Sequence, residues 1–197
     1  MKVVIIKYNA GNIRSVQIAL ERHGINPVVS DDPEVINSAD RIIFPGVGEA
    51  SSAMSYLQAR NLDKVVVDAR QPFLGICLGM QLMCRYSEEN DTPCLSIFEE
   101  DVIRFSTNDQ KIKIPQIGWN NIEKLSSGLF TGVQEKSFCY FVHSYFARIG
   151  PDTIAQSDYC GLYSAALHKD NFYGVQFHPE KSAETGATII TNFLNID

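Results

Sequence analysis

A short apolar run that turns into a helix at a cysteine constrains the fold of this chain most strongly. The run 73–76 predicts a buried strand, and a helical pattern follows Cys77, with apolar positions at Met80, Leu82, Met83 and Tyr86. Gly75 and Gly79 flank Cys77 at the spacing of a nucleophile elbow, with cysteine in place of serine. The glycines let strand and helix approach closely, and a helix N-terminus favours a thiolate. The stretch therefore predicts a reactive thiol; the alternative is a buried, inert core cysteine.

A second stretch supplies partners for such a thiol. Residues 172–180 predict a strand that ends in His178-Pro179-Glu180. Pro179 favours an extended conformation at His178, and side chains two apart in an extended segment lie on one side. His178 can then face Cys77 while Glu180 reaches the other ring nitrogen. The two stretches together predict a nucleophile, a base and an orienting carboxylate.

The order of the predicted elements indicates an α/β fold. Strands are predicted at 2–7, 27–29, 41–44 and 73–76, and helical segments at 13–23, from 31, at 49–60 and at 61–69, with a loop at 8–12. This alternation is typical of a doubly wound, mostly parallel central sheet with helices on both faces. After Glu99 the chain becomes β-rich, with strands predicted at 101–105, 111–114, 117–122, 138–146, 153–157 and 163–168 before a final helix at 183–194. No linker divides residues 1–197, so we expect a single domain.

Two glycines follow the strand at 41–44, in the sequence Pro45-Gly46-Val47-Gly48. Free backbone N–H groups in such a loop can bind a phosphate or an oxyanion. A dinucleotide fingerprint needs a third glycine, so that interpretation is weak. The alternative is an ordinary tight turn between strand and helix. Because Cys77 ends the next strand, an oxyanion-binding loop is favoured.

Composition argues against several classes of protein. The net charge is −6 and the pI is about 5.2, without a basic stripe, so nucleic acid is a poor candidate partner. No apolar run approaches the roughly 20 residues that span a bilayer. The 5 cysteines form no CxxC pair and no zinc set, so no metal site is predicted. A reduced, cytoplasmic setting fits best.

The Gly-Ile-Cys-Leu-Gly-Met-Gln elbow and the terminal Phe-His-Pro-Glu together resemble the class I glutamine amidotransferases. The loop at 45–48, Gly-Trp-Asn at 118–120 and Phe-Val-His-Ser-Tyr at 141–145 resemble the branch that forms the glutaminase subunits of imidazole glycerol phosphate synthases, in histidine biosynthesis. The resemblance implies hydrolysis of glutamine to glutamate and ammonia by Cys77, His178 and Glu180, without a cofactor. It implies an oxyanion hole of backbone N–H groups at Val47 or Gly48 and at Leu78, and substrate contacts at Gly48, Gln81, Glu89, Ser144 and Tyr145.

The resemblance also implies a partner, a (β/α)₈ barrel synthase (cyclase) subunit that would form a heterodimer with this chain and receive the ammonia through a channel. The residues that resemble interface positions are Asn12, Trp119, Tyr140 and Lys181. Many relatives end the first strand with an acidic residue where this chain has Lys7, which affects partner contact rather than the chemistry. The alternatives are a glutaminase for another synthase, a stand-alone cysteine hydrolase of the same fold and a non-catalytic binding subunit. Retention of Cys77 and His178 argues against the last.

Overall fold

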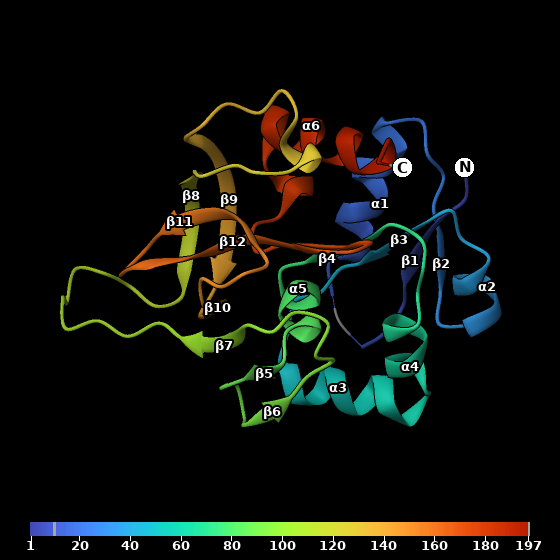
Figure 1. Cartoon of the computed structure of the whole chain (residues 1–197), viewed down its shortest axis with the longest axis horizontal. Helices are drawn as coiled ribbons and strands as arrows, with labels where there is room; N and C mark the ends of the chain where they lie inside the picture. Colours follow the sequence, from blue (N-terminus) through green and yellow to red (C-terminus); the bar gives the residue numbers. More distant parts are fainter. Residues whose placement is uncertain (10, 197) are drawn as a thin grey trace.

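A computed structural model describes residues 1–9 and 11–196 of the chain (Figure 1). Ala10, in the loop predicted after the first strand, and Asp197, at the end of the expected domain, lie outside the described residues. Among the described residues, no helix is both long enough and apolar enough to cross a membrane.

A mixed sheet forms the centre of the molecule, and its first half is parallel. The parallel strands run in the order β2 (Val28–Ser30), β1 (Val3–Ile6), β3 (Arg41–Phe44), β4 (Phe73–Ile76) and β13 (Phe172–Val175). The order continues through β12 (Leu162–Lys169), β10 (Tyr145–Ala147), β7 (Asp101–Arg104), β5 (Tyr86–Ser87) and β6 (Thr92–Pro93), with β11 (Thr153–Asp158) beside β12. A separate antiparallel ribbon pairs β8 (Gln116–Ile122) with β9 (Ser137–His143). The predicted α/β fold with a β-rich second half is confirmed.

Helices cover both faces of the parallel half of the sheet (Figure 1). The helices α1 (Ile13–Arg22) and α6 (Ala183–Leu194) lie on one face, and α2 (Pro33–Asn37), α3 (Ala50–Ala59), α4 (Leu62–Val67) and α5 (Leu78–Met83) lie on the other. Each face of the sheet has its own buried apolar cluster, and alternate residues of β1 contribute to the two. Val3 and Ile5 belong to one cluster, and Val4 and Ile6 belong to the other. A strand covered on both faces reads as a continuous apolar run, which is why β1, β3 and β4 are almost entirely apolar.

The glycines around Cys77 have the close-packing role that the sequence predicts. A Cβ on Gly79 would lie 1.8 Å from the carbonyl oxygen of Phe44, and one on Gly75 would lie 2.8 Å from the Met80 nitrogen. The helix α5 therefore packs backbone to backbone against β3 and β4. It ends at Met83, so the prediction that it continues to Tyr86 is wrong. Amides of the loop after β6 bind the last carbonyls of α5: Leu95 N–H donates to Leu82 O and Phe98 N–H donates to Met83 O, both at 2.9 Å.

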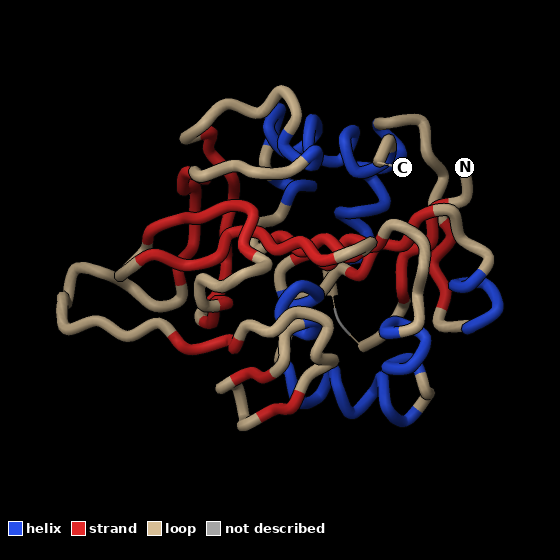
Figure 2. Tube along the Cα trace, viewed as in Figure 1, coloured by secondary structure: helices blue, strands red, loops and turns tan. Residues whose placement is uncertain are grey.

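Two strand predictions in the second half are also wrong. Residues 111–114 lie in the long loop between β7 and β8 (Figure 2), where the Asp109 carboxylate accepts from Lys111 N–H at 2.9 Å and folds the chain into a turn. The predicted strand at 138–146 breaks at Ser144 into β9 and β10. These two strands pair in different sheets, and the Ser144 carbonyl between them accepts from Phe105 N–H at 3.0 Å. The polar residues His143 and Ser144 stand at the break, but residues 138–146 contain no glycine or proline that would mark the end of a strand.

Candidate active site

Cys77 lies at the joint between β4 and α5 with an unusual backbone conformation. Its φ is 54° and its ψ is −109°, a region that non-glycine residues rarely occupy. Its N–H donates to Val175 O on β13 at 2.8 Å, and the residue is 5% exposed. The close packing of α5 on the sheet holds this conformation. The geometry is that of a nucleophile elbow, as the glycine spacing predicts.

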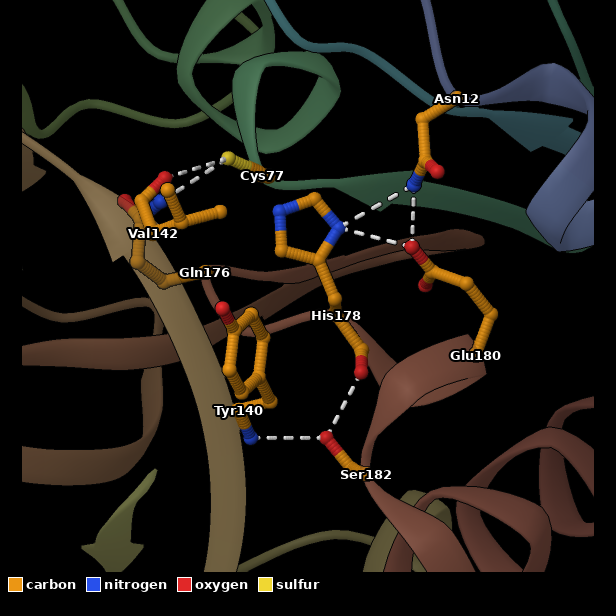
Figure 3. Close-up of polar contacts among 8 residues, drawn as sticks. All are labelled: Asn12, Cys77, Tyr140, Val142, Gln176, His178, Glu180 and Ser182. Carbon is orange, nitrogen blue, oxygen red and sulfur yellow. Dashed lines mark hydrogen bonds and ion pairs between the residues drawn. The ribbon is translucent and has the colours of Figure 1, made fainter. Parts of the chain in front are cut away.

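His178 and Glu180 follow β13 and form a buried pair. His178 Nδ1 lies 2.8 Å from Glu180 Oε1, and each side chain is 1% exposed. A carboxylate oxygen accepts only, so Nδ1 carries the proton and Nε2 is left on the side of the ring that faces Cys77 (Figure 3). Within the described residues, His178 Nε2 has no hydrogen-bond partner. The two stretches separated by about a hundred residues in the sequence thus meet at one point.

Asn12, expected at a partner interface, lies beside this pair. Its side-chain amide donates to Glu180 Oε1 and lies 3.4 Å from His178 Nδ1 (Figure 3). Asn12 has a φ of 73° and precedes α1, so the loop after β1 delivers it to the site. Nothing in the local sequence indicates this contact, because it joins residues 166 and 168 positions apart.

Charges around His178 favour its protonated form. Burial lowers the pKa of His178, but the charges on Cys77 and Glu180 outweigh burial and raise it to about 10. The nearby His143 behaves in the opposite way. Burial lowers the pKa of His143 to about 3, with the positive charge of His178 adding to the shift, while its Nδ1 donates to Tyr145 O at 2.7 Å. His178 is therefore the histidine that holds a proton beside the sulfur at neutral pH.

Among the described residues, the Cys77 sulfur has two hydrogen-bond contacts. The Cys77 thiol donates to Val142 O at 3.9 Å, and the Gln176 side-chain amide donates to the Cys77 sulfur at 3.7 Å (Figure 3). Gln176 is fully buried, and the sequence reasoning did not single it out. A signal was present, since Gln176 stands two residues before His178, an offset that places side chains on one side of an extended chain. The expectation that the strand continues to Glu180 is wrong, because β13 ends at Val175 and Pro179–Lys181 form a 3₁₀ helix, which brings the Glu180 carboxylate back to the His178 ring.

A pocket of about 280 Å³ opens next to Cys77. This volume is near the lower end for small-molecule sites. The structure gathers there every residue expected to contact the substrate or its oxyanion, namely Val47, Gly48, Leu78, Gln81, Glu89, Ser144 and Tyr145. Pro115, Val142 and His143 complete the lining.

Two of the expected substrate contacts are held in place by the backbone. Gln81 is 4% exposed, and its amide donates to Tyr145 O at 2.8 Å and to Gln176 Oε1 at 2.9 Å. Glu89 Oε2 accepts from Ala50 N–H at 2.8 Å, at the start of α3. Partial burial raises the pKa of Glu89, and the Ala50 N–H opposes that shift.

The expected oxyanion donors are not all free. Leu78 N–H donates to Gly46 O at 3.3 Å, so this N–H is already occupied within the loop. Gly46 packs tightly, because a Cβ there would lie 2.1 Å from the Tyr8 hydroxyl oxygen. That hydroxyl is buried and has no hydrogen-bond partner among the described residues. The structure therefore brings the donors together but leaves one of them engaged.

The outer face of the β8–β9 ribbon is apolar and exposed. Trp119 is 53% exposed and its ring lies 6.0 Å from that of Tyr140, over which Lys181 Nζ lies at 5.9 Å. Ile117 and Phe138 are also exposed, at 64% and 58%. Three of the four expected interface residues, Trp119, Tyr140 and Lys181, thus lie together. We call these three residues, with Ile117 and Phe138, the ribbon face.

The ribbon face is joined directly to the buried base. His178 N–H donates to Tyr140 O at 2.9 Å. Tyr140 N–H donates to Ser182 Oγ at 2.9 Å, and the Ser182 hydroxyl donates to His178 O at 2.7 Å (Figure 3). The backbone of His178 is therefore held by the same strand that carries Tyr140 on its outer side.

Comparisons with known proteins agree with this geometry. A profile of the family described as glutamine amidotransferase class-I matches residues 6–196. The chain is 54% identical over 196 residues to imidazole glycerol phosphate synthase subunit HisH of Bacteroides thetaiotaomicron and 45% identical over 198 residues to that of Escherichia coli K12, with each chain covered in full. The crystal structure of a glutamine amidotransferase has a TM-score of 0.74 at 18% identity, and the match covers 97% of this chain and 96% of that one. At that identity the likeness shows the fold alone.

Proposed function

The chain belongs to the class I glutamine amidotransferase family, and on that basis we propose that it is the glutaminase subunit of an imidazole glycerol phosphate synthase in histidine biosynthesis. The observation that carries the proposal is the meeting of Cys77 with the His178–Glu180 pair beside a pocket lined by the expected substrate contacts. The full-length identity to two synthase subunits places the chain in the branch that serves this synthase. We take residues 1–197 as one glutaminase domain.

The proposed reaction begins with attack of the Cys77 thiolate on the side-chain amide carbon of glutamine. The protonated His178 gives its proton to the leaving nitrogen, so ammonia departs and a thioester remains on Cys77. His178, now neutral at Nε2, takes a proton from water, and the resulting attack on the thioester releases glutamate and restores the thiolate. Glu180 holds the imidazole in the tautomer that this sequence needs.

The tetrahedral intermediates need donors for their oxygen, which we assign to backbone N–H groups at Leu78 and at Val47 or Gly48. Because Leu78 N–H is bonded to Gly46 O, the Gly46–Val47 peptide has to rotate before the hole is complete. Losing one oxyanion donor typically costs ~3 kcal/mol, or about two orders of magnitude in rate. We propose that this engaged state keeps the subunit slow until the partner binds.

The partner that we propose is a (β/α)₈ barrel synthase subunit that forms a heterodimer with this chain in the cytoplasm. The exposed ribbon face supports a docking surface at the base-bearing side of the site, since apolar and aromatic side chains are typical of interface centres. Ammonia is a small neutral molecule, so we expect a channel that carries it from Cys77 to the synthase site.

Ammonia release from glutamine tests the proposal directly. The purified chain is measured alone, and then with a candidate barrel synthase and its nucleotide ligand. Strong stimulation by the partner is expected. Brisk activity that ignores this partner would point to a stand-alone cysteine hydrolase, and stimulation only by a different synthase would move the chain to another branch of the family. Absence of activity in every setting would contradict a glutaminase.

Replacing Glu180 by glutamine is expected to move the alkaline limb of the glutaminase pH profile to lower pH. The pKa of His178 is raised to about 10, so the imidazolium is present at neutral pH and is lost only as the pH rises through that value. Glu180→Gln removes one of the two negative charges that raise this pKa, so the pKa of His178 should fall. A hydrogen bond to a charged group is worth about 1.5–3 kcal/mol, so the limb should move by roughly one to two pH units. The measurement is kcat against pH in the partner-bound complex.

The exposed Glu184 offers the matched control for this prediction. Glu184→Gln removes the same charge from the first turn of α6, away from the imidazole, and should leave the limb in place. An alkaline limb that stays put in Glu180→Gln would show that Glu180 does not set the proton affinity of the base.

Replacing Trp119 by alanine is expected to weaken binding of the synthase subunit by about 2 kcal/mol or more, roughly thirtyfold in Kd. Large, half-exposed aromatic side chains at the centre of an interface carry much of its binding free energy. Isothermal titration with the partner gives the Kd. Val28→Ala, on the exposed outer strand β2, is the control and should leave the Kd unchanged. Equal Kd values for both variants would place the docking surface elsewhere.

A further inference from the structure

A chain of buried amide groups connects the sulfur to the substrate pocket. Gln176 Nε2 lies 3.7 Å from Cys77 Sγ (Figure 3), Gln81 Nε2 lies 2.9 Å from Gln176 Oε1, and the same Gln81 nitrogen lies 2.8 Å from Tyr145 O. Gln176 is fully buried and Gln81 is 4% exposed, so water does not compete strongly for these contacts. The sulfur, Gln81 and Tyr145 all line the pocket.

The direction of every hydrogen bond in this chain is fixed by its far end. The Tyr145 carbonyl can only accept, so Gln81 has to present its NH₂ group there. The same NH₂ group faces Gln176, which therefore has to present its carbonyl oxygen to Gln81. Gln176 is left with its own NH₂ group toward the sulfur. Turning the Gln176 amide over would set two donors against each other inside the protein.

We propose that Gln176 is a further catalytic residue, whose side-chain amide donates to the Cys77 sulfur and stabilises the thiolate that attacks the substrate. A donor held at the sulfur favours the charged form of the thiol over the neutral one. His178 supplies the proton to the leaving group, and Gln176 holds the nucleophile from another side, so the two have separate roles. This inference rests on the proposed function, because it takes Cys77 as the nucleophile.

Alkylation of Cys77 by iodoacetamide measures the thiolate without glutamine or a partner. The rate is followed against pH by mass spectrometry of the Cys77 peptide, which separates it from the exposed Cys160. Gln176→Met keeps the length of the side chain and removes the donor. We expect the midpoint of the profile to move up by about one pH unit, so that the rate falls about tenfold at pH values below the wild-type midpoint. In the partner-bound complex, kcat should fall with little change in KM.

Gln116→Met is the matched control, since Gln116 is also buried and hydrogen-bonded, to the Tyr163 hydroxyl, without a contact to the sulfur. Its alkylation profile should match that of the wild type. A Gln176→Met protein that melts cooperatively and alkylates like the wild type would overturn the inference. Wild-type protein without glutaminase activity in any setting would instead overturn the proposed function, while the alkylation result would still stand by itself.

The wild-type protein provides a second measurement if the Gln176 variant does not fold. The side-chain NH₂ resonance of Gln176 in ¹⁵N-labelled protein should move with pH at the midpoint of the alkylation profile, because its acceptor changes from thiol to thiolate. The movement should vanish in Cys77→Ser. A resonance that stays constant through that midpoint would contradict a donor role for Gln176.

Discussion

Cys77→Ala should reduce partner-stimulated ammonia release by about five orders of magnitude or more, while leaving the fold intact. Removing the nucleophile of a comparable triad costs about 10⁶ in kcat, because no other group forms the covalent intermediate. The substituted side chain is smaller than cysteine and lies in an elbow whose conformation is held by α5 and the sheet, so we expect only a modest loss of stability. The measurement is glutaminase activity in the complex, together with the melting temperature of the isolated chain.

The exposed Cys160 gives the control for this variant. Cys160→Ser changes a thiol at the surface, outside the pocket, and should keep full activity. Persistent, partner-stimulated activity in Cys77→Ala would require a different nucleophile and would remove the basis of the proposed mechanism. Loss of activity in both variants would point to a general effect of thiol replacement instead.

Gly79→Ala should destabilise the protein strongly, although alanine is the better helix former. The gain in helix propensity is about 1 kcal/mol. This gain is opposed by a steric clash, because the new Cβ would lie 1.8 Å from the Phe44 carbonyl oxygen. That oxygen belongs to the backbone of the central sheet and cannot move alone. Overpacking of this kind costs about 1–3 kcal/mol and occasionally more, and we expect the upper part of that range here. The clash outweighs the propensity, so we predict a net loss of roughly 2 kcal/mol or more in the free energy of unfolding.

Urea unfolding of the variant measures this loss, and Gly128→Ala is its control. A Cβ on Gly128 would meet no atom within 4 Å, so we expect a change within about 0.5 kcal/mol. The displaced elbow in Gly79→Ala should also lower glutaminase activity in whatever protein remains folded. A variant as stable as the wild type would show that α5 can move away from β3 without cost.

The parts of the site that the sequence predicts are those that depend on short-range rules. Gly75 and Gly79 signal a close strand-to-helix turn, and Pro179 favours the extended conformation that His178 adopts. The pairing of His178 with Glu180 is as expected, but a 3₁₀ helix at Pro179–Lys181 produces it instead of an extended backbone. Both stretches end adjacent parallel strands, β4 and β13, and the carboxyl ends of such strands meet at one edge of a sheet. The residues of the triad could therefore be anticipated from two short windows, whereas their meeting depends on β4 and β13 being neighbours in the sheet.

Other features depend on contacts that no local pattern encodes. Asn12 reaches Glu180 because the loop after β1 passes the end of β13, and Leu78 N–H is occupied because Gly46 lies against α5. The break at Ser144 depends on which strands pair with β9 and β10, and no glycine or proline in the sequence marks it. Predicting these features requires the sheet order, which the sequence patterns do not specify.

The shared backbone at Tyr140 and His178 has an evolutionary consequence. Tyr140 O and N, Ser182 Oγ and His178 N and O form one connected set of hydrogen bonds, with the ribbon face outside and the base inside. If the ribbon face binds the synthase as we propose, a substitution that shifts β9 to suit a new partner also shifts the imidazole. Changes in β9 would then alter partner binding and turnover rate at the same time. A glutaminase that adapts to a different synthase therefore has to change side chains on the ribbon face without moving the backbone of β9.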